Sequence, residues 1–482
     1  MSSIKALLWL AAAALTAAQD DTSQMCSVKM ERVTVNNCLT NAKVPQASVG
    51  SDSYKFEINP YNTRVPYTPA AVAMPTTAKH VQDAVKCATQ SSVRVSAKSG
   101  GHSYASFGLG GENGHLIVDF KNMHNVTVNP TTFVATIQPG SRIGNVAQAL
   151  VGIGGLSLHG GYGYMSRLHG LTLENLVSAD VVTAAGNIVT ASATQNPDLF
   201  WALRGAGSCF GIVVSFQFKT FAAPLNNIFS YNLPASAVNP TAKSVNAVQN
   251  FANTQQPPEL NMRVLCNSYQ NQLIGVYYGL AADFKKAINP LLTELAITGG
   301  STRNTSWIDV LSTYAYGSLT VPIDHSVHDA FFSKSMMTPL LPQAAVEAWS
   351  DYLVNTARKV TRNWYILMDL HGGAGSAVTS VANNATAYAH HDALLKFELF
   401  DRDNSGTYPS TGFSFLNGWV NATMSNMDPD DMGMYINYAD TSLTVDQAHH
   451  YYWLSNYAKL TQLKTVWDPK GMFNYPQGVV GS

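Results

Sequence analysis

The stretch Lys98-Ser-Gly-Gly-His-Ser-Tyr104 directly follows a short strand-like run that begins at Val93. Two adjacent glycines and a histidine therefore stand where a strand enters a tight loop. Glycines accept positive φ angles, and successive backbone N–H groups in such a loop can bind an anion such as a pyrophosphate. The spacing is neither Gly-x-Gly-x-x-Gly nor a Walker sequence, which argues against a Rossmann or P-loop site. Taken alone, so short a motif is most often a turn with a surface histidine.

The chain around this loop has a mixed α+β pattern. Between Thr77 and about Thr220, short β-branched runs alternate with glycine-rich turns and brief helical patterns. Strands are predicted over residues 93–96, 115–119 and 134–137, and helices over 78–87 and 143–150.

The second half of the chain predicts another α+β domain. From about Pro224 to Asp428, amphipathic stretches such as 342–359 separate strands such as 273–278 and 364–369. A helical run over 448–464 follows, and Pro469 stops it. The length of 482 residues agrees with two or three domains at roughly 150 residues each.

Charge and the N-terminus exclude several classes of protein. The 29 Lys and Arg residues balance the 30 Asp and Glu residues without a run of like charge, so we expect no nucleic-acid partner. Residues 1–19 have the order of a secretory signal peptide, with Lys5, an apolar run over 6–15 and then small residues. Because this run is shorter than the ~20 residues that span a bilayer, we expect secretion to the extracellular space rather than a membrane anchor. Four sequons fit a secreted glycoprotein, at Asn125, Asn304, Asn384 and Asn421.

Cysteine usage argues against both a disulfide scaffold and a zinc site. The five cysteines, Cys26, Cys38, Cys87, Cys209 and Cys266, include no Cys-x-x-Cys pair, and we expect no bound metal. One or two disulfides are compatible with this number, and Cys38 with Cys87 is the pair we favour. At least one thiol then stays free.

Several further motifs follow the first in a fixed order. They are Gly154-Gly-Leu-Ser-Leu-His-Gly-Gly-Tyr-Gly163, Asp198-Leu-Phe-Trp-Ala-Leu-Arg-Gly-Ala-Gly-Ser208, Phe210-Gly-Ile-Val213, Tyr435-Ile-Asn-Tyr-Ala-Asp440 and Trp467-Asp-Pro-Lys-Gly-Met-Phe-Asn-Tyr-Pro-Gln477. In this order the chain resembles the FAD-linked oxidases of the vanillyl-alcohol-oxidase and berberine-bridge-enzyme type. It is most similar to the secreted fungal oligosaccharide oxidases, which convert reducing-end sugars to lactones and O2 to H2O2.

The resemblance implies a two-part architecture for a monomer. An FAD-binding domain of the PCMH type is expected over residues 20–222, and a berberine-bridge-type segment over 429–482 completes it. A substrate-binding domain, with an antiparallel sheet flanked by helices, is expected over 223–428. The expected cofactor is FAD, and the expected partners are an oligosaccharide substrate and O2.

The resemblance also implies how the flavin is held. In the family, the histidine that matches His102 is bound covalently to the flavin 8α position, and an imidazole is a suitable nucleophile for that bond. The second glycine-rich run lies alongside the isoalloxazine. The positions that the resemblance assigns to FAD are Ser99, Gly100, Gly101, His102, Ser103, Gly154, Gly155, Gly160, Gly161, Gly163, Gly207, Ile212, Tyr475 and Gln477. His159 and His169 are also candidate flavin neighbours, although lone histidines in turns are more often satisfied surface groups.

One departure from the family concerns a second covalent link. Many sugar-oxidising members bind flavin C6 through a cysteine that lies shortly before a Gly-Gly-His sequence. Here Leu150 runs directly into Val151, the cysteine is absent, and Leu156 stands where the histidine is expected. Three interpretations follow: a natural enzyme with a single link, a misread gene model or splice form, or a protein that binds flavin poorly.

Oxidation of an alcohol by flavin requires a base for the hydroxyl proton. In the sugar oxidases a tyrosine paired with an aspartate fills this role, and Tyr438 and Asp369 match these positions. A tyrosine acts as a base only if its pKa of about 10 is lowered or its proton has a partner. Strand alternation predicts Tyr438 on the face opposite Tyr435. The alternatives are a core tyrosine for Tyr438 and an ion pair with a lysine for Asp369.

The resemblance assigns further residues to the active site. Tyr104 matches an active-site tyrosine, and Glu398 and Phe400 match positions that bind sugar hydroxyls and stack on a sugar ring. Glutamine is common where this chain has Glu398. We therefore expect an oxidase of reducing-end sugars. The alternatives are an oxidase of a secondary metabolite or aromatic alcohol, and a catalytically impaired family member.

Overall fold

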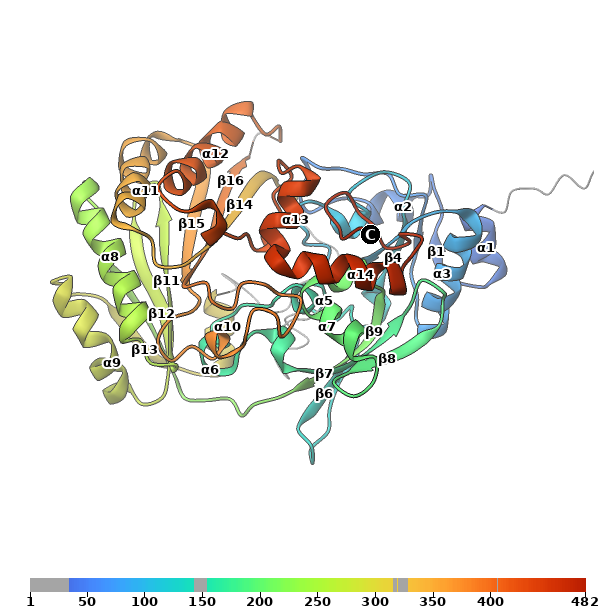
Figure 1. Cartoon of the computed structure of the whole chain (residues 1–482), viewed down its shortest axis with the longest axis horizontal. Helices are drawn as coiled ribbons and strands as arrows, with labels where there is room; N and C mark the ends of the chain where they lie inside the picture. The colour runs from blue at the N-terminus through green and yellow to red at the C-terminus, as the bar shows by residue number, and fades with distance from the viewer. Residues whose placement is uncertain (1–33, 143–153, 315–318, 320–327, 405) are drawn as a thin grey trace, which may run out of the picture.

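The computed structural model describes residues 34–142, 154–314, 319, 328–404 and 406–482. Its elements form two groups, with the C-terminal helices α13 (Val445–Trp453) and α14 (Tyr457–Trp467) lying against the group that contains the N-terminal half (Figure 1). The model confirms the predicted mixed α+β fold. Within the described residues, no helix is both long and apolar enough to cross a membrane.

The first sheet contains the strand that leads into the glycine-rich loop of residues 98–104. Its strands are ordered β1-β2-β4-β3, where β2, β4 and β3 are parallel, and they comprise β1 (Gln46–Ala47), β2 (Ala71–Ala73), β4 (Leu116–Asp119) and β3 (Val95–Lys98). Helix α3 (Ala78–Ser91) connects β2 to β3. The strand begins at Val95 rather than at Val93 because Ser92 adopts a left-handed conformation (φ 55°) and the Val93 N–H still donates to the Ala88 carbonyl of α3.

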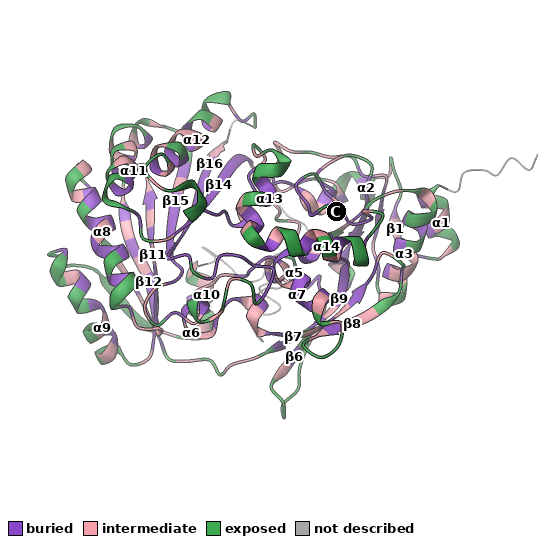
Figure 2. Cartoon of the chain, in the orientation of Figure 1, coloured by how far each residue is buried: buried purple, intermediate pink, exposed green. Residues whose placement is uncertain are grey.

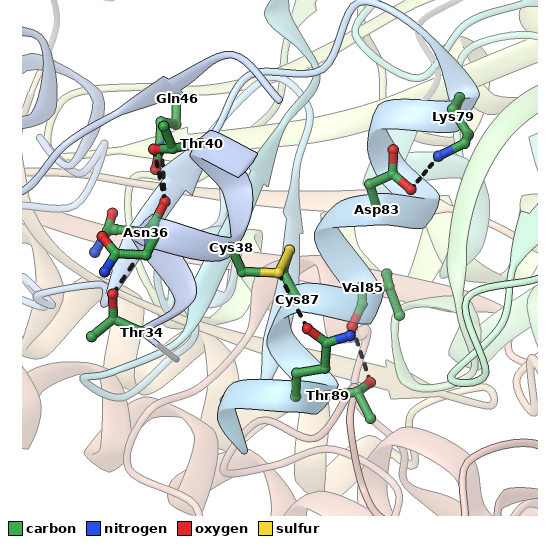
Figure 3. Close-up of a disulfide and its surroundings, with 12 residues drawn as sticks. Thr34, Asn36, Cys38, Thr40, Gln46, Lys79, Asp83, Val85, Cys87 and Thr89 are labelled. Carbon is green, nitrogen blue, oxygen red and sulfur yellow. Dashed lines mark hydrogen bonds and ion pairs between the residues drawn. A yellow bond between two sulfur atoms is a disulfide. The ribbon is translucent and has the colours of Figure 1, made fainter. Parts of the chain in front are cut away.

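A disulfide joins Cys38 of helix α1 (Val35–Asn41) to Cys87 of α3, as predicted (Figure 3). Cys209 and Cys266 are free and buried, while Cys26 lies outside the described residues.

A second sheet of five antiparallel strands completes this part of the molecule. The order is β5-β6-β9-β7-β8, and the strands are β5 (Val126–Val128), β6 (Val134–Ile137), β9 (Ile212–Lys219), β7 (Leu176–Val182) and β8 (Ile188–Ser192). Helix α7 (Pro197–Ala206) packs near it. The glycine-rich run that begins at Gly154 includes a short helix, α5 (Gly154–Leu158), and the predicted helix over 143–150 falls outside the described residues.

The middle of the chain forms a seven-stranded, fully antiparallel sheet. Its order is β13-β10-β12-β11-β15-β16-β14, with β13 (Ser301–Thr305), β10 (Asn226–Asn232), β12 (Asn271–Tyr278), β11 (Leu260–Asn267), β15 (Asn363–Leu370), β16 (Leu395–Asp403) and β14 (Ala330–Thr338). Figure 1 shows helices on its outer side, namely α8 (Val238–Thr254), α9 (Ala281–Glu294), α11 (Gln343–Asn355) and α12 (Ser410–Met424). Figure 2 shows that the central strands are buried and that only the outer faces of these helices are exposed.

The pairing register of this sheet places polar residues of three strands on one face. Asp369 of β15 lies opposite Arg263 of β11 and opposite Lys396 of β16. Two residues further along the same face, Glu398 follows Lys396. Charged residues from distant parts of the chain therefore meet in the middle of a buried sheet.

The C-terminal segment differs from the sequence prediction in two places. The predicted helix over 448–464 is split into α13 and α14 by the 3₁₀ turn at Leu454–Asn456, where Leu454 has φ 45° and the Asn456 side chain donates to the carbonyls of Asn383 and Thr386. The expected strand at Tyr435 is also a 3₁₀ turn, Ile436–Tyr438.

This second turn overturns the predicted side-chain alternation. A 3₁₀ helix has three residues per turn, so residues i and i+3 lie on the same side. The rings of Tyr435 and Tyr438 accordingly pack edge to face with centroids 5.2 Å apart, instead of pointing to opposite faces.

Removal of the Cys38–Cys87 disulfide will destabilise this region, because the bond restricts a loop of 49 residues in the unfolded chain. We expect Cys38→Ser/Cys87→Ser to lose about 2–4 kcal/mol in the free energy of unfolding, measured by urea titration. Dithiothreitol should lower the stability of the wild type to that of the double variant and leave the variant unchanged. Equal stability of both proteins without reductant would contradict this expectation.

Candidate active site

A row of three charges, two of them fully buried, lies at the centre of the site. Arg263 Nε lies 2.7 Å from Asp369 Oδ1, and Lys396 Nζ lies 2.5 Å from Asp369 Oδ2. Asp369 and Lys396 are each about 1% exposed. Burial opposes ionisation of Asp369, but the charges of Arg263 and Lys396 outweigh it, so the pKa of Asp369 is lowered from its usual value.

Lys396 connects this row to Tyr438. Its ammonium donates to Tyr438 Oη at 3.2 Å and also lies over the rings of Tyr438, Tyr435 and Tyr162, 4.6, 5.2 and 5.0 Å from their centroids. Burial lowers the pKa of Lys396, and Asp369 partly offsets this effect. The sequence-matched pair of Asp369 and Tyr438 is therefore brought together, with Lys396 between the two side chains.

The phenol of Tyr438 is neutral over the physiological pH range. Burial raises its pKa well above the usual value, and the negative charges of Glu398 and Asp369 act in the same direction. A hydrogen bond from an ammonium favours the phenolate and opposes this shift. Lys396 therefore stabilises the ionised form of Tyr438, as the positive charge of Arg263 also does, against burial and the two carboxylates.

A second cluster surrounds the carboxylate of Glu398, which is 4% exposed. Tyr104 and Tyr365 both donate to Glu398 Oε1, each at 2.9 Å. Tyr365 stacks on Phe400 with centroids 4.9 Å apart, and Tyr104 stacks on Tyr438 at 5.8 Å. The residues matched to base and sugar-binding roles thus form one continuous site, to which three distant segments contribute.

The His102 loop borders the same cluster. It leaves β3 and passes through Gly101, whose φ of 74° favours glycine. The His102 ring is exposed, and the ring of Tyr61 packs against it with centroids 4.5 Å apart. The surrounding protein and the positive charge of Arg142 lower the pKa of His102, so the imidazole is neutral at neutral pH.

Several of the glycines matched to FAD contacts face open space. A Cβ placed on Gly155 or Gly163 would meet no atom within 4 Å, and on Gly100 it would meet only His102, at 3.7 Å. Ser99 Oγ donates to the Pro139 carbonyl, and the nearby Ser141 Oγ is buried with no hydrogen-bond partner among the described residues. Open space at glycines of both glycine-rich runs, with an unsatisfied hydroxyl near the first of them, fits a large phosphate-bearing cofactor such as FAD.

Other residues matched to FAD have partners within the protein. Gly160 and Gly161 have positive φ, and a Cβ on Gly160 would clash with the ring of Tyr435, whose hydroxyl accepts from the Gly161 N–H at 2.8 Å. Gln477 Nε2 donates to the Asp440 carbonyl at 2.8 Å. Four of the remaining five contact other parts of the protein: Ser103 Oγ accepts from the Phe107 N–H, Tyr475 packs on Phe107, Gly207 lies against Leu158, and Ile212 belongs to the core next to α3. The fifth, Gly154, begins helix α5. Their contact with FAD stays a prediction.

The two other histidines differ in their surroundings. His159 is buried between the Gly155 carbonyl (2.9 Å) and Ser208 Oγ (2.8 Å), and burial lowers its pKa to about 4. His169 stacks on Phe221 with centroids 3.8 Å apart. The Leu150–Val151 junction lies outside the described residues.

Sequence reasoning missed four residues of the site: Arg263, Lys396, Tyr365 and Tyr61. Lys396 lies two residues before Glu398, and Tyr365 lies four residues before Asp369. Because every second residue of a strand lies on the same face, these spacings could have pointed to both residues. The pairing of Arg263 with Asp369 depends on the order of strands in the sheet, and no local pattern encodes it.

Family models match both parts of the chain that carry the flavin motifs. The model described as "FAD binding domain" matches residues 69–192, and the model described as "Berberine and berberine like" matches residues 434–480.

Similar proteins cover nearly the whole chain. A xylooligosaccharide oxidase of Thermothelomyces thermophilus is 47% identical, with 95% of this chain and 96% of that protein covered. A chitooligosaccharide oxidase of Gibberella zeae is 37% identical, with 94% and 96% covered.

Solved structures agree with these relatives. The structure of a xylooligosaccharide oxidase from Myceliophthora thermophila in complex with xylobiose has a TM-score of 0.91 at 46% identity, covering 93% of this chain and 99% of that one. A glucooligosaccharide oxidase of Acremonium strictum has a TM-score of 0.89 at 36% identity, with 94% and 99% covered. The chain therefore belongs to the FAD-linked oxidoreductases of the berberine-bridge-enzyme type, in the group of the fungal oligosaccharide oxidases.

Proposed function

We propose that this chain is a secreted, FAD-dependent oxidase that converts the C1 hydroxyl at the reducing end of an oligosaccharide to a lactone and reduces O2 to H2O2. The observation that carries this proposal is the meeting of Tyr438, Lys396 and Asp369 beside the Glu398 cluster and the His102 loop. The similar xylo-, chito- and glucooligosaccharide oxidases support the substrate class.

In this proposal, residues 20–222 and 429–482 form the domain that binds FAD, and residues 223–428 form the domain that binds the sugar. When bound, FAD accepts a hydride from the substrate carbon and passes the electrons to O2. His102 is the residue that attaches the cofactor. The glucooligosaccharide oxidase of Acremonium strictum, whose cofactor is a 6-S-cysteinyl, 8α-N1-histidyl FAD, supports attachment through a histidine.

Tyr438 is the general base that accepts the proton of the sugar hydroxyl in this proposal. Because burial keeps most of the phenol protonated, Tyr438 acts as the base in its phenolate form, which takes the hydroxyl proton and becomes the neutral phenol. The Lys396 ammonium, 3.2 Å from Tyr438 Oη, stabilises that phenolate before the proton is transferred. Asp369 acts on Tyr438 through Lys396, by fixing the ammonium in place and balancing its charge.

The Glu398 cluster orients the sugar. With Oε1 taken by two phenols, the second carboxylate oxygen is left to accept from a sugar hydroxyl. The stacked rings of Tyr365 and Phe400 offer an apolar surface for the face of a sugar ring. Tyr104 connects this sugar-binding cluster to the proposed base, because it donates to Glu398 and stacks on Tyr438.

Secretion is proposed from the N-terminal signal over residues 1–19. The sequon asparagines Asn125, Asn304, Asn384 and Asn421 are all exposed, which supports their use as glycan acceptors. The Cys38–Cys87 disulfide is also typical of an oxidising compartment.

One experiment distinguishes the proposed sugar oxidase from the two alternative functions. Peroxide release is measured with cello-, xylo-, chito- and malto-oligosaccharides and with aryl alcohols, together with the absorbance near 450 nm after FAD supplementation. We expect yellow protein and peroxide from at least one sugar. Activity on aryl alcohols alone would favour oxidation of an aromatic or secondary metabolite. Colourless protein would favour an impaired family member.

Replacement of Tyr438 by phenylalanine removes the proton acceptor and keeps the ring. We expect Tyr438→Phe to slow flavin reduction by the sugar about 10²-fold or more, with little change in sugar affinity, as measured by anaerobic stopped-flow absorbance. Tyr269→Phe, at an exposed turn residue, is the matched control and should behave as the wild type. An unchanged rate in Tyr438→Phe would exclude this tyrosine as the base.

Replacement of Asp369 by asparagine leaves two buried cations without a counter-ion. We expect Asp369→Asn to lower the free energy of unfolding at pH 7 by about 3–5 kcal/mol. Because the folded-state pKa of Asp369 is depressed, its contribution is present above its unfolded pKa of about 3.9 and is lost as pH falls through the lower folded value. The variant should therefore lose less stability than the wild type below about pH 4.

The matched control for this experiment is Asp52→Asn, which removes an exposed ion pair with Lys55. Urea unfolding between pH 3 and pH 7 should show almost no change for the control. If both variants gave the same stability and the same acid dependence, the role assigned to Asp369 would be wrong.

A further inference from the structure

A short segment over residues 59–64 connects the two parts of the molecule. The Tyr61 carbonyl accepts from the Asp329 N–H at 3.1 Å, and the Thr63 N–H donates to the Asp329 carbonyl at 2.9 Å. Asp329 immediately precedes β14 of the seven-stranded sheet. The backbone on both sides of Asn62 is thereby tied to the edge of that sheet.

The side chain of Asn62 fixes the same segment to the His102 loop. Asn62 is fully buried, and its Nδ2 donates to the Tyr104 carbonyl at 2.7 Å. Its Oδ1 accepts from the backbone N–H groups of Arg64 (3.2 Å) and Phe331 (3.4 Å). Tyr61 consequently has a defined backbone position relative to both His102 and the sheet.

The Tyr61 ring is packed on the imidazole that is proposed to carry the flavin. The two rings are tilted by 39° with centroids 4.5 Å apart. On its other sides, Tyr61 contacts Phe331 edge to face at 5.4 Å and Tyr104 at 6.3 Å. His102 itself lies on an irregular loop after two glycines and is exposed, so a ring contact is an effective way to restrict its rotation.

We propose that Tyr61 is a positioning residue for covalent flavin attachment: its ring, fixed by the 59–64 segment, holds the His102 imidazole in the orientation in which a ring nitrogen bonds to the flavin 8α carbon. This inference rests on the proposed tether at His102. Tyr61 contributes no atom to the bond and acts by packing alone.

The attachment reaction balances with O2 as the oxidant. A C–H bond of the 8α methyl group and the N–H bond of the neutral imidazole are replaced by one C–N bond. Two protons leave, one from the methyl group and one from the ring nitrogen, and two electrons pass through the isoalloxazine to O2, which becomes H2O2. A reaction between one nitrogen and one carbon depends strongly on orientation, so a rotating imidazole slows it.

The phenol of Tyr61 is not required as a base. Burial raises its pKa, and the negative charges of Asp329 and Glu398 raise it further. The hydroxyl therefore stays protonated at neutral pH, and a phenylalanine ring should serve equally well. This separates a packing role from an acid–base role.

The experiment compares wild type, Tyr61→Phe, Tyr61→Leu and Tyr61→Ala, each prepared without flavin and then incubated with FAD in air. Covalent incorporation is followed by the mass of the denatured protein and by flavin retained in acid-precipitated pellets. His102→Ala gives the level without attachment. Tyr67→Ala, a partly buried tyrosine of the same region that packs on a separate cluster around Tyr54, is the matched control.

We expect Tyr61→Phe and Tyr67→Ala to incorporate flavin at the wild-type rate, and Tyr61→Leu and Tyr61→Ala to bind FAD but attach it about 10-fold or more slowly. Tyr61→Leu keeps an apolar side chain of similar bulk, so it decides the question if Tyr61→Ala fails to fold. A wild-type rate in Tyr61→Leu would overturn the proposal, and so would a slow rate in Tyr61→Phe. Absence of any attached mass in the wild type would instead refute the tether at His102.

Discussion

An ionised carboxylate inside a sheet is the constraint on which the rest of the site depends. Asp369 lies on a central strand with almost no solvent contact, where an unpaired charge is unfavourable by several kcal/mol. Arg263 and Lys396 from the two neighbouring strands solve this problem by placing one cation on each carboxylate oxygen. Both contacts form only when the three strands are in register. The ion pairs of Asp369 therefore stabilise the correct pairing of β11, β15 and β16.

The row of Arg263, Asp369 and Lys396 carries one more positive than negative charge, and part of this excess lies next to Tyr438. The Lys396 ammonium is directed at Tyr438 Oη, while Glu398 supplies a compensating negative charge two residues along the same strand. Neutrality is thus reached over four side chains and not within any one pair. A change at any of these positions alters the electrostatic potential at the tyrosine, which makes this row of charges and the chemistry of the site hard to separate.

The sequence predicted elements well where the information was local. The motif around His102, the helix at Ala78 and the strands of the middle domain all follow from nearby residues. The turn at Tyr438 was missed because a five-residue stretch with alternating side chains also fits a strand, and its 3₁₀ form depends on packing against Gly160 and Gly161. Arg263 could not be predicted, since its pairing with Asp369 depends on the strand order of a large antiparallel sheet, which is set by long-range contacts. Lys396 could have been found from its place two residues before Glu398 on the same strand face.

The position of Tyr438 also bears on the synthesis of the protein. Tyr438 and the nearby Asp440, which forms an ion pair with Lys334 of the middle sheet, belong to the last tenth of the chain. Domains fold as units, N-terminal parts first, while the ribosome is still adding residues. Sheets and loops can therefore be complete before Tyr438, the proposed proton acceptor, has been translated. A nascent polypeptide that ends before this residue lacks the proposed base, so assembly of the reaction centre waits for the final stage of translation.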